Sequence, residues 1–292
     1  MPHVRCDKDR QGADGAERGD ERAQGKKAQS PEAGARRAGT ACRAAVTAAL
    51  ETGYRHIDTA QIYDNESDVG AALAESGLKR GDIFLTTKIW LDRVGDGPLQ
   101  KSADESLKRL KTDYVDLLLL HWPVQDVPLA EQIKALKDVQ AAGKARLIGV
   151  SNYTVAMLRE VVETLGAPIV TNQVEYHPFL SQKAVLDFVR RHHMFLTAYS
   201  PLARGAVRDD PLLSAIGRKY GKTPGQVTLR WLIQQGNIAA IPKAGSPAHI
   251  KGNFEIFDFS LSPAEMEQIH GLARPDGRLI NPGWSPRWDR AA

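Results

Sequence analysis

The stretch HIDTAQIYDNE, residues 56–66, places an aspartate and a tyrosine directly after an apolar run. The first five letters have the composition of the end of a buried strand. Burying a carboxylate is unfavourable unless a partner neutralises it, so we expect a positively charged partner for Asp58 elsewhere in the chain. Candidate partners lie in other segments with the same pattern, in which an apolar run ends on a polar residue.

Such runs recur along the chain, and amphipathic stretches of helical length lie between them, which predicts a parallel β-sheet covered by helices. In a barrel the carboxyl ends of all strands meet at one mouth, whereas an open doubly wound sheet gathers its ligands at one switch point. Polar ends on every run therefore favour a TIM (β/α)8-type barrel. The expected strands are 56–60, 83–88, 115–121, 145–151, 169–174, 195–200 and 238–243, and the expected helices are 41–52, 66–76, 98–110, 128–142, 154–164, 182–192, 209–220, 224–235 and 262–270.

The beginning of the chain differs in composition from the rest. Between Val4 and Val46 it contains no valine, isoleucine, leucine, methionine, phenylalanine, tryptophan or tyrosine. Such a segment cannot bury enough apolar area to offset the entropy lost on ordering. We therefore expect residues 1–38 to form a disordered, loosely attached or aberrant leader, and residues 39–292 to form a folded barrel.

Composition limits the classes of partner. The 292 residues carry a net charge of +4 with acids and bases interleaved, which does not indicate nucleic acid. No apolar run is long enough to span a membrane and no signal core is present, so we expect a cytoplasmic protein without a membrane partner. The two cysteines, Cys6 and Cys42, fit a reducing compartment. His177 and His192–His193 lack companions at metal-binding spacing, so no metal is expected.

Asp58, Tyr63, Lys88 and His121, all near the ends of expected strands, form a candidate catalytic set. If they share the mouth, Lys88 neutralises Asp58. An ammonium beside a phenol lowers the phenol pKa from about 10, which would make the tyrosine a general acid, and the histidine would orient a carbonyl oxygen. Taken singly, each residue fits a structural explanation better, such as an ion pair or a core histidine. Four complementary groups near the ends of neighbouring strands are harder to explain in this way, and together they favour a catalytic role.

The chain resembles the aldo-keto reductases from about residue 39 to its end. The resemblance is carried by GYRHIDTAQIYDNE, TTKIW, LLLLHWP, IGVSNY, NQVEYHP, YSPLARG and IPKAGSPAHIKGNFEIFDF, and it is greatest to small bacterial members resembling 2,5-diketogluconate reductase. It implies a TIM barrel that reduces small aldehydes or ketones with NADPH, methylglyoxal and keto sugar acids among them. It assigns proton donation to Tyr63, tuning of that tyrosine to Lys88 and Asp58, and carbonyl orientation to His121.

The resemblance also implies a set of cofactor-binding residues. Ser151, Asn152 and Gln173 would hold the nicotinamide carboxamide, and Tyr199 would stack on the ring so that one face meets the substrate. The remaining implied residues are Ser200 and Leu202 at the pyrophosphate, and Lys243, Ser246, His249 and Asn253 toward the adenosine phosphate.

Two positions at the adenosine end depart from the family pattern. His249 stands where the family usually has an arginine, and Gly252 stands where it usually has a glutamate. A neutral imidazole holds a ribose phosphate less firmly than a guanidinium does. We expect NADPH to remain preferred by a narrower margin, with NADH also usable.

A larger departure precedes residue 39, where the family's N-terminal hairpin, first strand and glycine-rich turn are not recognisable. The first strand is therefore expected to be missing or replaced. Two explanations stay open. One is a shifted reading frame or misassigned start; the other is a genuine chain whose incomplete barrel exposes two strand edges.

Aromatic residues after the expected strands indicate a substrate pocket. Trp90 and Trp122 are expected to wall it, although core packing explains Trp122 equally well. The C-terminal RLINPGWSPRWD resembles a loop folded over the mouth, where Trp284 and Arg287 would meet the far end of the substrate. A solvated tail is the alternative.

The leading interpretation is a monomeric enzyme that acts on a small carbonyl compound. The alternative is a noncatalytic nucleotide-binding barrel that serves as a sensor or regulatory subunit. The intact catalytic set argues against this alternative, and the unrecognisable first strand argues for it.

Overall fold

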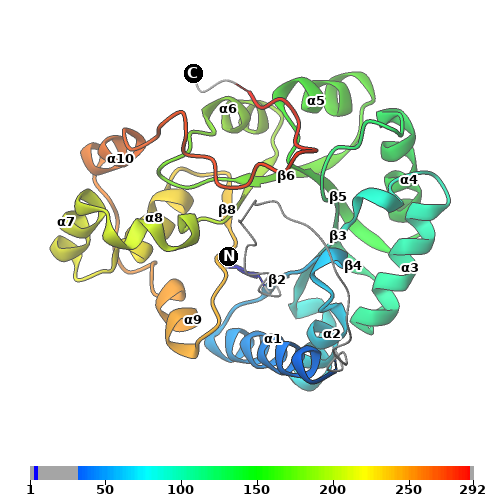
Figure 1. Cartoon of the computed structure of the whole chain (residues 1–292), viewed down its shortest axis with the longest axis horizontal. Coiled ribbons are helices and arrows are strands. Elements are labelled where there is room, and N and C mark those ends of the chain that lie inside the picture. The colour runs from blue at the N-terminus through cyan, green and yellow to red at the C-terminus, as the bar shows by residue number, and fades with distance from the viewer. Residues whose placement is uncertain (1–2, 6–31, 290–292) are drawn as a thin grey trace, which may run out of the picture.

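The computed structural model describes residues 3–5 and 32–289 of the chain. Eight parallel strands lie side by side in sequence order. The sheet curls so that the helices lie on its outside (Figure 1), which confirms the predicted TIM-type barrel. The strands are β1 (His3–Arg5), β2 (His56–Asp58), β3 (Phe84–Ile89), β4 (Val115–Leu120), β5 (Ala145–Ser151), β6 (Ile169–Glu175), β7 (Phe195–Tyr199) and β8 (Ile238–Ala240).

All of the described α-helices except Pro247–Phe254 overlap a predicted helix, and four of them begin with a capping side chain followed by proline. Within the described ranges, no helix is both long and apolar enough to cross a membrane. The helices are α1 (Glu32–Thr52), α2 (Glu66–Glu75), α3 (Pro98–Leu110), α4 (Leu129–Ala141), α5 (Val155–Arg159), α6 (Lys183–Arg191), α7 (Pro211–Tyr220), α8 (Pro224–Gln234), α9 (Pro247–Phe254) and α10 (Pro263–His270).

Two parts of the N-terminal 38 residues are described. His3–Arg5 pairs in parallel with β2, so a replacement strand fills the first position of the sheet, one of the two expected outcomes; such pairing uses backbone groups. Helix α1 begins at Glu32, where alanine, arginine and glutamate favour a helix. Residues 1–2 and 6–31 of the expected disordered segment lie outside the described residues.

The interior of the barrel is close-packed. Strand β4 is buried along its whole length and contributes consecutive leucines to the core. On the next strand, a Cβ at Gly149 would lie 2.7 Å from Leu119 Cδ2 and 2.9 Å from the Thr171 carbonyl oxygen. Packing of this density fixes the strands relative to one another, and with them the polar side chains at their ends.

The C-terminal segment after α10 runs across one side of the barrel (red in Figure 1). The Arg274 N–H donates to the Phe179 carbonyl oxygen at 3.1 Å. Farther along, the Val155 N–H donates to the Asp289 carboxylate at 3.0 Å, which ties the segment to the start of α5. The segment is therefore held at both ends by the loops that follow β5 and β6.

Gly70 allows α2 to approach the end of α3 closely. A Cβ at this position would lie 2.6 Å from the carbonyl carbon and oxygen of Leu110 and 2.7 Å from the Arg109 carbonyl oxygen. These are backbone atoms, which cannot rotate away as the end of a side chain can. An added methyl group must therefore push the two helices apart.

We expect Gly70→Ala to lower the free energy of unfolding by ~1–3 kcal/mol, the range for overpacking a filled interior. Gly81→Ala is the matched control, because a Cβ at Gly81 meets no heavy atom within 4 Å. Urea unfolding followed by circular dichroism measures both. Equal unfolding midpoints for the two variants would contradict the role of Gly70 in helix packing.

Candidate active site

A buried ion pair joins the ends of β2 and β3. Lys88 Nζ donates to Asp58 Oδ1 and, at 2.9 Å, to the Thr59 carbonyl oxygen, and both charged side chains are 0% exposed. The other carboxylate oxygen accepts a hydrogen bond from Gln173 Nε2 on β6 at 2.8 Å. Burial also lowers the pKa of His56, on the same strand as Asp58, to about 4, so this imidazole adds no positive charge at neutral pH. The partner that Asp58 requires is thus Lys88.

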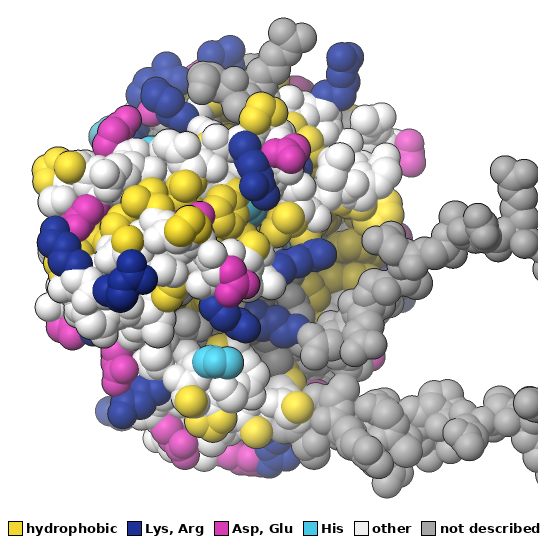
Figure 2. All heavy atoms as spheres, turned by 60° about the vertical axis from the view of Figure 1, so that its left-hand side comes forward, with side chains coloured by type: hydrophobic (Ala, Val, Ile, Leu, Met, Phe, Trp, Pro, Cys, Tyr) yellow, Lys and Arg dark blue, Asp and Glu magenta, His cyan; other side chains and the backbone are white. Residues whose placement is uncertain are grey.

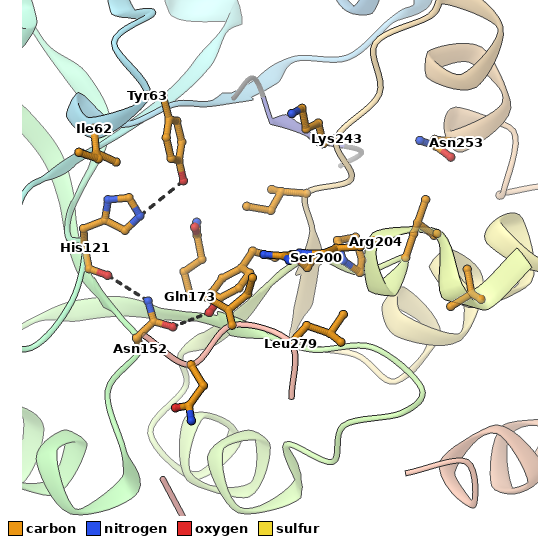
Figure 3. Close-up of a pocket in the computed structure, with 18 of the residues that line it drawn as sticks. Ile62, Tyr63, His121, Asn152, Gln173, Ser200, Arg204, Lys243, Asn253 and Leu279 are labelled. Carbon is orange, nitrogen blue, oxygen red and sulfur yellow. Dashed lines mark hydrogen bonds between the residues drawn. The ribbon is translucent and has the colours of Figure 1, made fainter. Parts of the chain in front are cut away.

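Tyr63 and His121 lie above this pair. Tyr63 ends the 3-10 helix η1 (Gln61–Tyr63) that follows β2, and its ring centre is 5.1 Å from Lys88 Nζ. Its Oη lies 3.4 Å from His121 Nε2, as the dashed line in Figure 3 shows. The Trp90 ring meets the imidazole edge-on, with 5.1 Å between ring centres. The structure therefore brings all four candidate catalytic side chains together.

A chain of hydrogen bonds continues from His121 around the mouth. Asn152 Nδ2 donates to the His121 carbonyl oxygen at 3.0 Å, and Tyr199 Oη donates to Asn152 Oδ1 at 2.8 Å (Figure 3). Ser151 Oγ donates to the Gln173 carbonyl oxygen at 2.8 Å. These bonds fix the orientation of Asn152, which has a left-handed backbone with φ of 66°.

One cavity of about 1460 Å³ extends from the catalytic set to α9. In Figure 3, Tyr63 and His121 lie on one side of it and Lys243 and Asn253 on the other. Thirteen of the residues predicted for the site line it: Tyr63, Trp90, His121, Trp122, Asn152, Gln173, Tyr199, Ser200, Leu202, Lys243, His249, Asn253 and Trp284.

The other predicted residues lie behind or beside this cavity. Asp58 and Lys88 support the wall without facing it, and the Ser151 hydroxyl points to the backbone of β6. Ser246 caps α9 by accepting a hydrogen bond from the His249 N–H at 3.3 Å. Arg287 is exposed and does not line the cavity.

The cavity also has basic walls that the sequence analysis did not assign. Arg204 and Arg208 line it, on the segment after β7, in which Arg204 has φ of 52°. Figure 2 shows basic side chains gathered near the middle of the face that carries α7, α8 and α9. The only available sequence signal was the short run LARGAVRD, because the left-handed turn that directs Arg204 toward the cavity is not visible in composition.

Residues 279–282 and Trp284 of the C-terminal segment form another wall of the cavity. Their position depends on contacts with residues more than a hundred positions earlier, which sequence periodicity does not reveal. Among the described residues, no cluster of histidine, cysteine, aspartate and glutamate side chains could hold a metal ion. His177 instead pairs with Glu175, and His192 with Glu163.

Known proteins resemble this chain over most of its length. The aldo/keto reductase family matches residues 29–274. Methylglyoxal reductase DkgB of Yersinia pestis is 40% identical over 84% of this chain and 92% of its own length. A solved structure described as 2,5-diketo-D-gluconic acid reductase B has a TM-score of 0.84 and 51% identity, over 86% of this chain and 90% of that one. A form of Gox0644 in complex with NADPH has a TM-score of 0.77 and 33% identity, over 83% and 88% of the respective chains.

We expect Asp58→Asn to lower the free energy of unfolding by ~3–5 kcal/mol, because it leaves the buried Lys88 ammonium without its carboxylate. Asp92→Asn is the matched control: the Asp92 side chain is 68% exposed and pairs with Arg93 at 3.4 Å. Removing such a surface pair costs about 0–1 kcal/mol. Denaturant unfolding of both variants measures the difference. Similar decreases in the free energy of unfolding would contradict a larger contribution of the buried pair to stability.

Proposed function

Since the chain belongs to the aldo/keto reductase family, we propose that it reduces small aldehydes or ketones to alcohols with NADPH as the cofactor. The observation that carries this proposal is the position of Tyr63 Oη, 3.4 Å from His121 Nε2 and above the buried Lys88–Asp58 pair. A proton donor, its supporting charge and a second hydrogen-bonding group thus converge at one end of a long cavity.

The residues around the cavity fit NADPH. A volume of about 1460 Å³ exceeds the ~300–1,000 Å³ of ordinary small-molecule sites, which leaves room for a dinucleotide and a substrate together. Arg204, Arg208 and Lys243 supply positive charge for phosphate groups, and His249 and Asn253 of α9 line the same cavity. Asn152 and Gln173 offer amide groups to the carboxamide, and Tyr199 offers a ring face for stacking.

In the proposed reaction, bound NADPH supplies a hydride to the carbonyl carbon. Tyr63 donates the proton to the carbonyl oxygen as negative charge develops there. The Lys88 ammonium stabilises the phenolate that remains, and Asp58 keeps that ammonium in place. His121 Nε2 donates a hydrogen bond to the same oxygen and orients it. A proton from solvent then restores the phenol, so the products are an alcohol and the oxidised cofactor.

We propose small, polar carbonyl compounds as substrates, with methylglyoxal and keto sugar acids as the first candidates. The similar proteins include a methylglyoxal reductase and a 2,5-diketo-D-gluconic acid reductase. Trp90 packs edge-on against His121, and Trp122 and Trp284 add further aromatic surface to the cavity. We also propose that the enzyme works as a monomer, since the described residues of one chain supply every group in this scheme. The cytoplasm is the compartment that we propose for it.

We expect Tyr63→Phe to lower kcat for methylglyoxal reduction by about 10²–10⁴-fold, the usual contribution of a positioned general acid. NADPH affinity should stay the same, because the substitution removes only a hydroxyl group. Turnover is followed by the loss of NADPH absorbance, and affinity by NADPH fluorescence titration. Full turnover in the variant would refute proton donation by Tyr63 and favour a sensor role for the barrel.

We expect His249→Arg to raise the ratio of kcat/KM with NADPH to kcat/KM with NADH by about tenfold, the effect of one added charge-assisted hydrogen bond to a phosphate. Lys251→Arg on the same helix is the control, since this exposed side chain pairs with Glu255 at 3.6 Å. A wild-type enzyme that strongly prefers NADH, or an unchanged ratio in His249→Arg, would contradict the proposed contact.

A further inference from the structure

Glu175 is a fully buried carboxylate that the proposed chemistry does not use. It ends β6, two residues after Gln173, the residue that holds Asp58. Its side chain is 0% exposed. A buried carboxylate requires several hydrogen bonds to compensate for lost hydration, so its partners indicate what it does.

Those partners belong largely to the C-terminal segment. Glu175 Oε1 accepts hydrogen bonds from the Leu279 N–H at 2.7 Å and from His177 Nε2 at 2.9 Å. Oε2 accepts from the Ile280 N–H at 2.9 Å and lies 3.9 Å from Arg278 Nη1. Burial alone would raise the pKa of Glu175, but these hydrogen bonds outweigh it and the pKa lies below its usual value. The group is therefore an anion at neutral pH, and both of its oxygens act as acceptors.

This contact fixes the backbone of residues that line the reaction cavity. Leu279 and Ile280 are lining residues, and Asn281, Pro282 and Trp284 continue the same wall. The wall is also supported from its other side, because Arg278 stacks on Trp288 at 3.7 Å and Trp288 Nε1 donates to Asn281 Oδ1 at 2.8 Å. Of these supports, the Glu175 carboxylate is the one that comes from a barrel strand.

We propose that Glu175 is a specificity-determining positioning residue, whose carboxylate holds the 279–284 wall at the distance from the catalytic set that larger carbonyl substrates require. This role rests on the proposed reductase function. Methylglyoxal is small, so its binding should depend little on the position of the wall. An aromatic aldehyde extends farther from the reacting carbonyl group, so its binding should depend more on that position.

Glu175→Gln tests the contact directly. In this variant one of the two carboxylate oxygens becomes an NH2 group, which is a donor and cannot accept from the backbone N–H that this oxygen faced. Hydrogen exchange of the Leu279 and Ile280 amides, followed by mass spectrometry on the full-length protein, should accelerate by about tenfold or more in the variant. Unchanged exchange would overturn the positioning role, whether or not the enzyme turns over.

Kinetics with two substrates test the consequence. In Glu175→Gln the KM for 4-nitrobenzaldehyde should rise about ten- to a hundredfold, the scale of a 1 Å misplacement, while kcat and the KM for methylglyoxal change less than about twofold. Glu163→Gln is the matched control, because Glu163 also pairs with a histidine, at 3.1 Å, but its side chain is 48% exposed on the π-helix η4 (Glu160–Thr164) that follows α5. Equal KM changes for both substrates would overturn specificity determination.

Gly277→Ala supplies a second test if Glu175→Gln folds poorly. A Cβ at Gly277 would lie 1.7 Å from the Phe179 carbonyl oxygen, so the variant must displace the segment while leaving the carboxylate intact. It should raise the KM for 4-nitrobenzaldehyde and spare methylglyoxal, and a displaced segment with unchanged kinetics would overturn the proposal. If the wild-type protein binds NADPH but reduces neither aldehyde, the proposed function fails, and the exchange experiment alone still decides the position of the wall.

Discussion

The buried pair of Lys88 and Asp58 is the interaction on which the site depends. An ammonium and a carboxylate at 0% exposure are tolerable only because each has further hydrogen-bond partners, the Thr59 carbonyl for one and the Gln173 amide for the other. The partners come from β2, β3 and β6, so the pair exists only when the barrel is assembled. Folding of the barrel and assembly of the charged pair beneath Tyr63 are therefore one event.

Much of this arrangement could be predicted from residues. Runs such as VDLLLL, buried along its full length, and ARLIGVS, which forms β5 with the expected bounds, carry their strand signal in composition. Because parallel strands of a barrel end at one mouth, the polar residues after them had to converge. That geometric rule, more than any single residue, is why Asp58, Lys88 and His121 could be grouped before the structure was known.

The parts that could not be predicted depend on contacts between distant segments or on the backbone alone. Strand β1 pairs through backbone groups, which leave no apolar pattern. Arg204 faces the cavity because of a left-handed turn. In the sequence, Glu175 is a polar residue at the end of an apolar run like several others. Its role depends on hydrogen bonds from the backbone N–H groups of Leu279 and Ile280, 104 and 105 positions later. The wall of the cavity thus has no local signature.

Glu175 holds this wall through hydrogen bonds from backbone N–H groups, which do not involve the side chains of Leu279 and Ile280. Where the wall stands and what it presents to a ligand are consequently independent properties. Mutation can exchange those two side chains for others of different size or polarity, and the main chain will still be anchored to the strand beneath. New preferences for ligands can then arise by drift at these positions without changes to Tyr63, His121 and the pair of Lys88 and Asp58.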